Sequence, residues 1–302
     1  MKTITSLIVL IVLVSCPSSV NKIKIDKTYH SGLKKLNSDI PYTILYSKDV
    51  LQQARVCATL VEEAYLFLSQ IMGPKKEFCL CVISEEEWQK KIDIPIMPFC
   101  WKGNVVFCPG KNVIADGTKM MIERLPKEIS SPLVKTYTNN QGELDMNLYA
   151  QKLVIHELMH NFQDPGNGEN IPISWWLIEL HANMGLYAFY KAKHPDELKY
   201  ITTLADFTIA HPSADIKHTS LSDFDSLYSA LKEYGYYQMK FTKAAQIIID
   251  SMGNDILKPV NDFIIKYDGQ KKEGIDQDKL KMMLADEVDP YVNEAINRFF
   301  PD

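Results

Sequence analysis

Residues 154–160 read VIHELMH, and this stretch decides how the whole chain is interpreted. It contains the pattern His-Glu-x-x-His, with histidines at His156 and His160. Positions i and i+4 of a helix lie on one face, so both imidazoles can reach a single metal ion. The flanking residues are apolar on most sides, which predicts a buried helix. Burying two histidines and Glu157 without partners is costly, and a bound zinc ion removes that cost.

The Glu157 carboxylate lies on the neighbouring face, where it can act as general base toward a metal-bound water. Two histidines do not complete a zinc site, so a third ligand is required. Glu179 is the favoured ligand, because eighteen residues separate it from His160 and it is the inward polar exception in an apolar helix that Ser174 caps. A buried carboxylate requires a cation. The alternative ligands are Asp164, Glu169 and His181.

The His-Glu-x-x-His motif, followed after eighteen residues by Glu179 in the run Trp-Leu-x-Glu, resembles the gluzincin superfamily of zinc metallopeptidases. It is similar to thermolysin and, in spacing, to the aminopeptidase N group. The specific match covers residues 150–190, with weaker agreement in lobe order over residues 75–265. The resemblance implies one Zn²⁺ per chain held by His156, His160 and Glu179, a water as fourth ligand, and hydrolysis of a peptide or protein substrate.

The chain departs from the aminopeptidase pattern on both sides of the motif. In aminopeptidases Gly-Phe follows the ligand glutamate, and an upstream Gly-x-Met-Glu-Asn strand binds the free amine. Here Leu180 and His181 follow Glu179, and Gly103–Phe107 stands where that strand is expected. The sequence therefore leaves open the choice between exopeptidase and endopeptidase.

Two further residues have roles that the resemblance implies. Asn183 stands where thermolysin-like enzymes place an acid that orients a histidine ligand. Tyr237, near the start of a predicted helix, is the expected oxyanion-stabilising group, with Tyr236 as second choice. A tyrosine cluster that only packs the helical lobe is the alternative.

The N-terminus predicts export. A lysine and an apolar run from Ile4 to Val14, too short to span a bilayer, are typical of a signal peptide over residues 1–15. Leu13–Cys16 resembles the bacterial lipobox, which implies a lipidated Cys16 and a membrane anchor in the bacterial cell envelope. An ordinary cleaved signal peptide, with secretion, is the alternative. No later stretch is apolar enough to span a membrane.

Composition excludes several classes of protein. Of 302 residues, 46% are hydrophobic and 24% charged, which excludes wholesale disorder. The net charge of −5, without a basic block, argues against a nucleic-acid partner. Six cysteines are too few for a disulfide scaffold, and Cys79-x-Cys81 followed by Cys100 and Cys108 is not a usual zinc spacing. Buried thiols are favoured, with a Cys100–Cys108 pair across a hairpin as the alternative.

The expected fold class is α+β with a zinc-peptidase architecture. After a lipidated, tether-like segment over 16–40, an N-terminal α/β lobe with a small mixed sheet spans 41–145, and zinc-binding helices with a helical lobe span 146–302. Strands are predicted at 41–47, 78–83 and in a hairpin within 97–114, and 115–145 as a loop-rich insertion. The predicted helices are 49–72, 84–91, 146–162, 174–193, 196–209, 222–232, 236–252, 255–267 and 278–299.

The favoured function is an exported, lipid-anchored zinc metallopeptidase, whose sheet edge near Asn104–Phe107 holds an extended peptide by strand addition. The alternative is a non-proteolytic surface binding or structural lipoprotein that keeps a gluzincin fold. The presence of Glu157 argues against the alternative, because a pure binding protein needs no general base.

Overall fold

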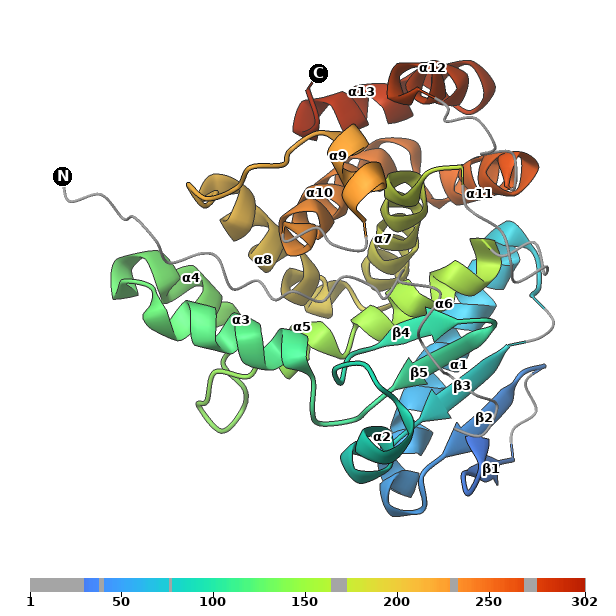
Figure 1. Cartoon of the computed structure of the whole chain (residues 1–302), viewed down its shortest axis with the longest axis vertical. Helices are drawn as coiled ribbons and strands as arrows, with labels where there is room; N and C mark the ends of the chain where they lie inside the picture. The colour runs from blue at the N-terminus through green and yellow to red at the C-terminus, as the bar shows by residue number, and fades with distance from the viewer. Residues whose placement is uncertain are drawn as a thin grey trace.

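The protein is mixed α+β, with a small sheet and a majority of helices (Figure 1). A computed structural model describes residues 30–37, 41–75, 78–163, 173–228, 233–268 and 276–301. The predicted signal peptide, the Cys16 lipidation site and most of the predicted tether lie outside the described residues. Within them, no helix is both long and apolar enough to cross a bilayer.

The sheet has five strands in the order β1-β2-β3-β5-β4. The strands are β1 (Lys34–Leu36), β2 (Thr43–Tyr46), β3 (Cys79–Val82), β4 (Phe99–Trp101) and β5 (Asn104–Phe107). The three inner strands β2, β3 and β5 are parallel, and β1 and β4 run antiparallel to them at the two edges. The predicted hairpin is therefore confirmed as β4–β5. The predicted peptide-binding edge is wrong, because β5 is an inner strand and β4 is the edge.

Helices cover both faces of the sheet, and β3 and β5 are accordingly buried at consecutive positions. α1 (Leu51–Met72) packs on the face that carries Leu80 and Val105. α2 (Glu85–Lys91) packs its Trp88 on the opposite face, against Cys81 and Val106. The central strands are consequently apolar on both sides.

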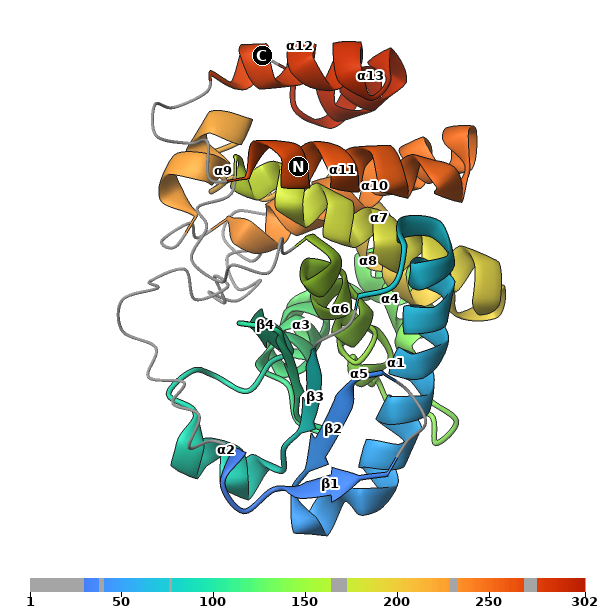
Figure 2. The same cartoon turned by 90° about the vertical axis from the view of Figure 1, so that its right-hand side faces the viewer.

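The remaining helices lie in successive layers above the sheet, with α12 and α13 outermost (Figure 2). They are α5 (Asn147–Ala150), α6 (Leu153–Gln163), α7 (Trp175–Lys193), α8 (Lys199–Ala210), α9 (Leu221–Leu227), α10 (Tyr234–Met252), α11 (Leu257–Tyr267), α12 (Gln277–Glu287) and α13 (Pro290–Phe299). Three 3₁₀ turns precede α1, α8 and α11: η2 (Lys48–Val50), η3 (Pro195–Glu197) and η4 (Asn254–Ile256). One continuous hydrophobic core runs from Tyr42 beside β2 to Phe300 after α13, so the sheet and the helices share it.

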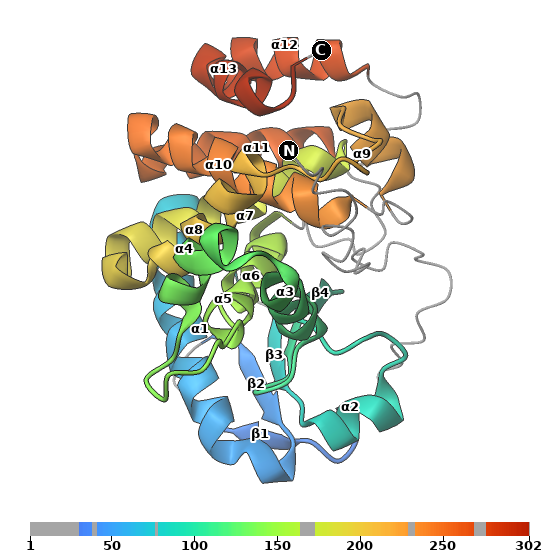
Figure 3. The same ribbon diagram turned by 90° about the vertical axis from the view of Figure 1, so that its left-hand side faces the viewer.

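The predicted loop-rich insertion is wrong. Residues 115–145 belong largely to α3 (Val113–Arg124) and α4 (Lys127–Tyr137), which flank α5 and α6 (Figure 3). Pro126 stands just before α4, where a proline does not interrupt a helix. Pro132 inside α4 removes one backbone hydrogen bond. The helix is retained because its Tyr137 hydroxyl donates to Tyr200 O and accepts from Leu204 N on α8.

Two predicted helices are each divided in two. The stretch 146–162 contains a turn at Gln151–Lys152 between α5 and α6. The stretch 278–299 is interrupted before Pro290, which opens α13. Proline disfavours helical backbone in the residue before it, and Asp289 is extended at φ −169°. Asp289 then caps the new helix by accepting from Tyr291 N.

The crossing of α6 and α7 places the motif helix against the next helix in the chain. Gly185 on α7 lies at this crossing, and a Cβ added there would come within 2.2 Å of Met159 Sδ on α6. A side chain at position 185 would therefore force the two helices apart or displace Met159. The absence of a side chain at position 185 keeps Glu179 close to the motif histidines.

Candidate metal centre

The motif residues converge as the helical spacing predicts. The ligand atoms of His156, Glu157 and His160 lie within 4.8 Å of one another, and the two imidazole centroids are 4.9 Å apart. His156 and Glu157 are buried, whereas His160 is half-buried. One turn of α6 thus presents two imidazoles and a carboxylate to the same space.

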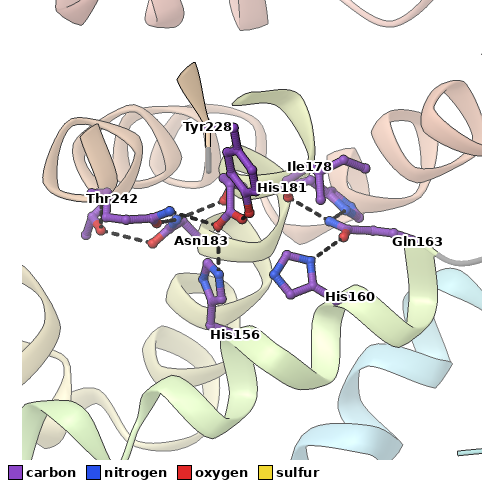
Figure 4. Close-up of polar contacts among 10 residues, drawn as sticks. His156, His160, Gln163, Ile178, His181, Asn183, Tyr228 and Thr242 are labelled. Carbon is purple, nitrogen blue, oxygen red and sulfur yellow. Dashed lines mark hydrogen bonds and ion pairs between the residues drawn. The ribbon is translucent and has the colours of Figure 1, made fainter. Parts of the chain in front are cut away.

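Glu179 reaches this group from α7. Its Oε2 atom lies 3.0 Å from His156 Nε2 (Figure 4). Ser174 begins α7 by accepting from Leu177 N, as the sequence predicts for an N-cap. Because it contacts His156, Glu179 lies on the face of α7 that is turned toward α6.

Two polar side chains hold the Glu179 carboxylate in place. The Tyr228 hydroxyl donates to Oε1 at 2.5 Å, and Gln238 Nε2 donates to Oε2 at 2.8 Å. The Tyr228 ring is itself stacked on Trp175, with centroids 4.4 Å apart. No local pattern points to Tyr228 or Gln238, because they lie 49 and 59 residues along the chain from Glu179.

The charges of this cluster are strongly coupled. Burial raises the pKa of Glu179, but the hydrogen bond with His156 and the charges of His160 and His156 outweigh burial and bring it to about 2. Burial lowers the pKa of His156, yet the Glu179 carboxylate reverses the shift, so the net direction is upward. Burial raises the pKa of Glu157 to about 8. The site therefore keeps Glu179 ionised beside an imidazole.

The donor set fits a zinc ion. Zinc bonds of about 2.0–2.1 Å to nitrogen and oxygen place two tetrahedral ligands about 3.3 Å apart, close to the 3.0 Å between His156 Nε2 and Glu179 Oε2. Within the part of the chain that the structure describes, Glu157 Oε2 is buried without a hydrogen-bond partner. Three ligands beside an uncommitted acid match the composition of a catalytic zinc site.

A hydrogen-bonded chain orients His160. Its Nδ1 lies 2.7 Å from Gln163 Oε1, and Gln163 Nε2 donates to Ile178 O and to His181 Nδ1. His181 Nε2 donates in turn to Leu257 O at 3.0 Å. Because Gln163 presents its oxygen to His160, Nδ1 carries the proton and Nε2 is left for a metal. His156 lacks such support, since its Nδ1 has no partner among the described residues.

His181, the one alternative ligand that lies within the described residues, is not brought to the centre. Both ring nitrogens of His181 are occupied by the contacts just described, and burial lowers its pKa to about 4, so it is a neutral core histidine. Asp164 and Glu169 lie outside the described residues.

Asn183 is part of the centre but not in the predicted way. Its amide donates to Glu179 O and to Gln238 Oε1, and its Oδ1 accepts from Thr242. It contacts no histidine ligand in the described structure. By holding the oxygen of Gln238, Asn183 turns the amide nitrogen of Gln238 toward Glu179, so it supports the carboxylate instead.

Tyr237 is not at the centre. Its hydroxyl donates to Ser220 O at 2.8 Å, and its ring stacks on Phe300 at 5.7 Å between centroids. This placement does not support an oxyanion role, and it matches the alternative of a tyrosine that packs the helical lobe. Tyr236 places its ring beside Lys240. Tyr234, at the first position of α10, lines the cavity described next.

A cavity of about 80 Å³ opens beside the motif. Its polar wall includes His156, Glu157, His160, Tyr234 and Gln238. Its apolar wall includes Met97, Ile114, Leu153, Leu204 and Met239, from the segment before β4, from α3, α6 and α8, and from α10. The cavity can therefore accept an apolar group next to the metal ligands.

Neither a protein-family profile nor a curated protein matches the chain. Its neighbours among solved structures are M1 zinc metallopeptidases. A mutant from Deinococcus radiodurans bound to a Tyr-Ser-Ala substrate is 8% identical, with a TM-score of 0.46 over 88% of this chain and 51% of that protein. The M1 zinc metallopeptidase from Deinococcus radiodurans is 9% identical, with a TM-score of 0.46 over 88% of this chain and 50% of that protein. A two-domain M1 zinc metallopeptidase mutant bound to L-tryptophan is 9% identical, with a TM-score of 0.44 over 88% of this chain and 50% of that protein. The chain spans about half the length of these proteins.

Proposed function

We propose that this protein is a zinc-dependent peptidase of the gluzincin type. The observation that carries the proposal is the convergence of His156, His160 and Glu179 beside Glu157, whose buried Oε2 has no partner in the described structure. A structural zinc site has no use for an uncommitted acid of this kind, whereas a hydrolytic site requires one.

Each residue then has a defined task. His156, His160 and Glu179 would hold a zinc ion, which would supply Lewis-acid chemistry toward a carbonyl oxygen and a water. Glu157 accepts the proton of the attacking water and delivers it to the leaving amine. The nearby cavity wall offers Tyr234 as the hydroxyl that donates to the developing oxyanion.

The substrate is an extended peptide bound along β4. This strand has one unpaired edge in the described sheet, and the backbone of Cys100 on it hydrogen-bonds Glu157. A peptide added to β4 would therefore place its backbone beside the general base. The cavity next to the ligands has a largely apolar wall, which favours a hydrophobic side chain close to the cleaved bond.

The decisive experiment compares peptide-library cleavage by the wild type and by Glu157→Gln. The substitution keeps the shape of the side chain but removes the proton acceptor, so the cleavage rate should fall by about 10²–10⁴-fold. Glu294→Gln makes the same chemical change at an exposed position on the outer helix α13 and should leave cleavage unchanged. Equal rates for wild type and Glu157→Gln would favour the non-proteolytic binding protein.

We further propose that the protein is exported and anchored in the bacterial cell envelope through Cys16. The support is the sequence alone, in which a lysine and a short apolar run end at Leu13–Cys16. The intact mass of protein expressed in a bacterium should show a lipidated N-terminal Cys16, and Cys16→Ser should leave the membrane fraction. An unmodified N-terminus at another residue would contradict this proposal.

A further inference from the structure

A second cluster of metal-binding side chains lies on the opposite side of the sheet from α6. It consists of His30, in the turn before β1, and Cys79 and Cys81, at alternate positions of β3. Their ligand atoms all lie within 4.8 Å of one another. Neither cysteine forms a disulfide within the described part of the chain.

The distances in this cluster match the edges of a zinc coordination tetrahedron. Bonds of about 2.3 Å to sulfur and 2.0–2.1 Å to nitrogen place two thiolates about 3.8 Å apart, and a thiolate and an imidazole about 3.6 Å apart. The Sγ atoms of Cys79 and Cys81 are 3.5 Å apart, and Cys81 Sγ lies 3.6 Å from His30 Nε2. The three side chains are thus already arranged around one position.

The surroundings prepare these groups for a metal. The His30 ring hydrogen-bonds the Asn104 side chain. Asn104 already donates its amide protons to Trp101 O and Lys102 O, so its oxygen accepts from the ring. An imidazole that donates one proton in this way keeps its other nitrogen as a ligand.

A disulfide fits this place less well than a metal. Bonded cysteines hold their Cβ atoms about 3.8 Å apart, whereas alternate residues of a strand are separated by about 6.6 Å along it. Joining Cys79 to Cys81 would therefore distort β3, which pairs with β2 on one side and β5 on the other. A metal ion bridges the two sulfurs without moving the strand.

We propose that His30, Cys79 and Cys81 form a second zinc site, with three protein ligands and one position left for solvent. The ion would fasten the turn at His30 to β3, two strands away in the sheet, and so hold the start of the described chain on the face covered by α2. Among the described residues the cluster contains no acid, so this site lacks the general base that stands beside the ligands on α6. The proposal is independent of the peptidase activity.

The test measures zinc per chain in the full-length protein, purified under reducing conditions with zinc present. The wild type should hold two ions. His156→Ala should leave one, and adding Cys79→Ser and Cys81→Ser to it should leave none. His30→Ala, at a half-buried position outside β3, should weaken zinc binding at the second site without disturbing β3. Cys57→Ala removes a buried thiol of α1 outside the cluster and should keep both ions.

Cobalt provides the spectroscopic signature. Co²⁺ added to the His156→Ala protein should give near-ultraviolet thiolate-to-cobalt absorption, which should vanish in Cys79→Ser/Cys81→Ser and persist in Cys57→Ala. The proposal is overturned if the double cysteine variant keeps the zinc content of its parent. It is also overturned if thiol counting shows a Cys79–Cys81 disulfide in the purified wild type.

Discussion

The described part of the chain has two clusters of side chains that could hold a metal, the helical centre and the strand cluster, and they differ in what accompanies these side chains. The helical centre combines two imidazoles and a carboxylate with an uncommitted acid and a cavity. Among the described residues, the strand cluster combines two thiols and an imidazole without an acid, and it does not line the cavity beside the motif. Ligand number is the same in both. The neighbouring acid and the accessible space are therefore what separate the proposed catalytic site from the proposed second zinc site.

The largest expected effect on this comparison comes from Glu179→Ala. Loss of a carboxylate ligand leaves two buried imidazoles without a counter-charge. Removing a residue that only supports a ligand lowers metal affinity by up to about 10²-fold, so losing the ligand itself should lower zinc affinity at the helical centre by more than that. Metal titration should then show one tight ion, at the strand cluster, in place of two. Glu294→Gln is the surface control.

A different result for Glu179→Ala would break the assignment. Undiminished zinc binding in this variant, combined with loss of an ion in His181→Ala or Glu169→Ala, would move the third ligand elsewhere. The described structure gives Glu179 the advantage over His181, because both nitrogens of His181 are committed to Gln163 and Leu257.

The contrast also explains what the sequence could predict. The pair His156 and His160 is separated by one helical turn, so a local pattern is enough to bring the imidazoles together. Cys79 and Cys81 stand two positions apart on β3 and so share one strand face, but no local pattern points to the third member of the cluster. His30 lies in a segment interpreted as a tether, and it reaches β3 only because β1 pairs with β2 and β2 pairs with β3. The order of strands in a sheet cannot be predicted from the spacing of residues within one segment.

The same limit applies inside the helical centre. The capped helix and its inward Glu179 followed from local pattern, whereas Tyr228 and Gln238 required knowledge of how α9 and α10 pack on α7. The prediction of Tyr237, with Tyr236 as second choice, meets a related limit, because the tyrosine that lines the cavity is Tyr234. Which of them faces the cavity depends on the position of α13, whose following residue Phe300 stacks on the Tyr237 ring.

The next effect in size should come from Gln163→Ala. This residue fixes the tautomer of His160, and removing such support reduces zinc affinity by about 10–100-fold. Gln163→Glu keeps an acceptor for His160 Nδ1 but loses the donors to Ile178 O and His181. The zinc affinity of this variant should therefore lie between that of Gln163→Ala and that of the wild type. Titration of the helical centre in a Cys79→Ser/Cys81→Ser background isolates this ion. Equal affinity in all three proteins would show that Gln163 does not orient the ligand.

Gly185→Ala tests whether the helical centre depends on the approach of α6 and α7. The added Cβ would meet Met159 Sδ at 2.2 Å, and relieving that overlap should cost about 1–3 kcal/mol of unfolding free energy. Chemical denaturation measures the loss. When Met159→Ala is combined with it, the total loss should be smaller than the sum of the two single losses. Additive losses would place the strain elsewhere. Zinc at the strand cluster should be unaffected.

The smallest effect should belong to Tyr237→Phe, and it separates a packing tyrosine from a catalytic one. The substitution removes only the hydrogen bond to Ser220 O, so stability should fall by about 1 kcal/mol while peptide cleavage keeps its rate. Tyr234→Phe removes a hydroxyl from the cavity wall and should reduce kcat more than KM, because a developing oxyanion is stabilised only in the transition state. The opposite result, in which Tyr237→Phe reduces kcat and Tyr234→Phe does not, would contradict this assignment. The Tyr237 hydroxyl would then have to leave Ser220 O when substrate binds, and α10 would have to move relative to the helical centre during the reaction.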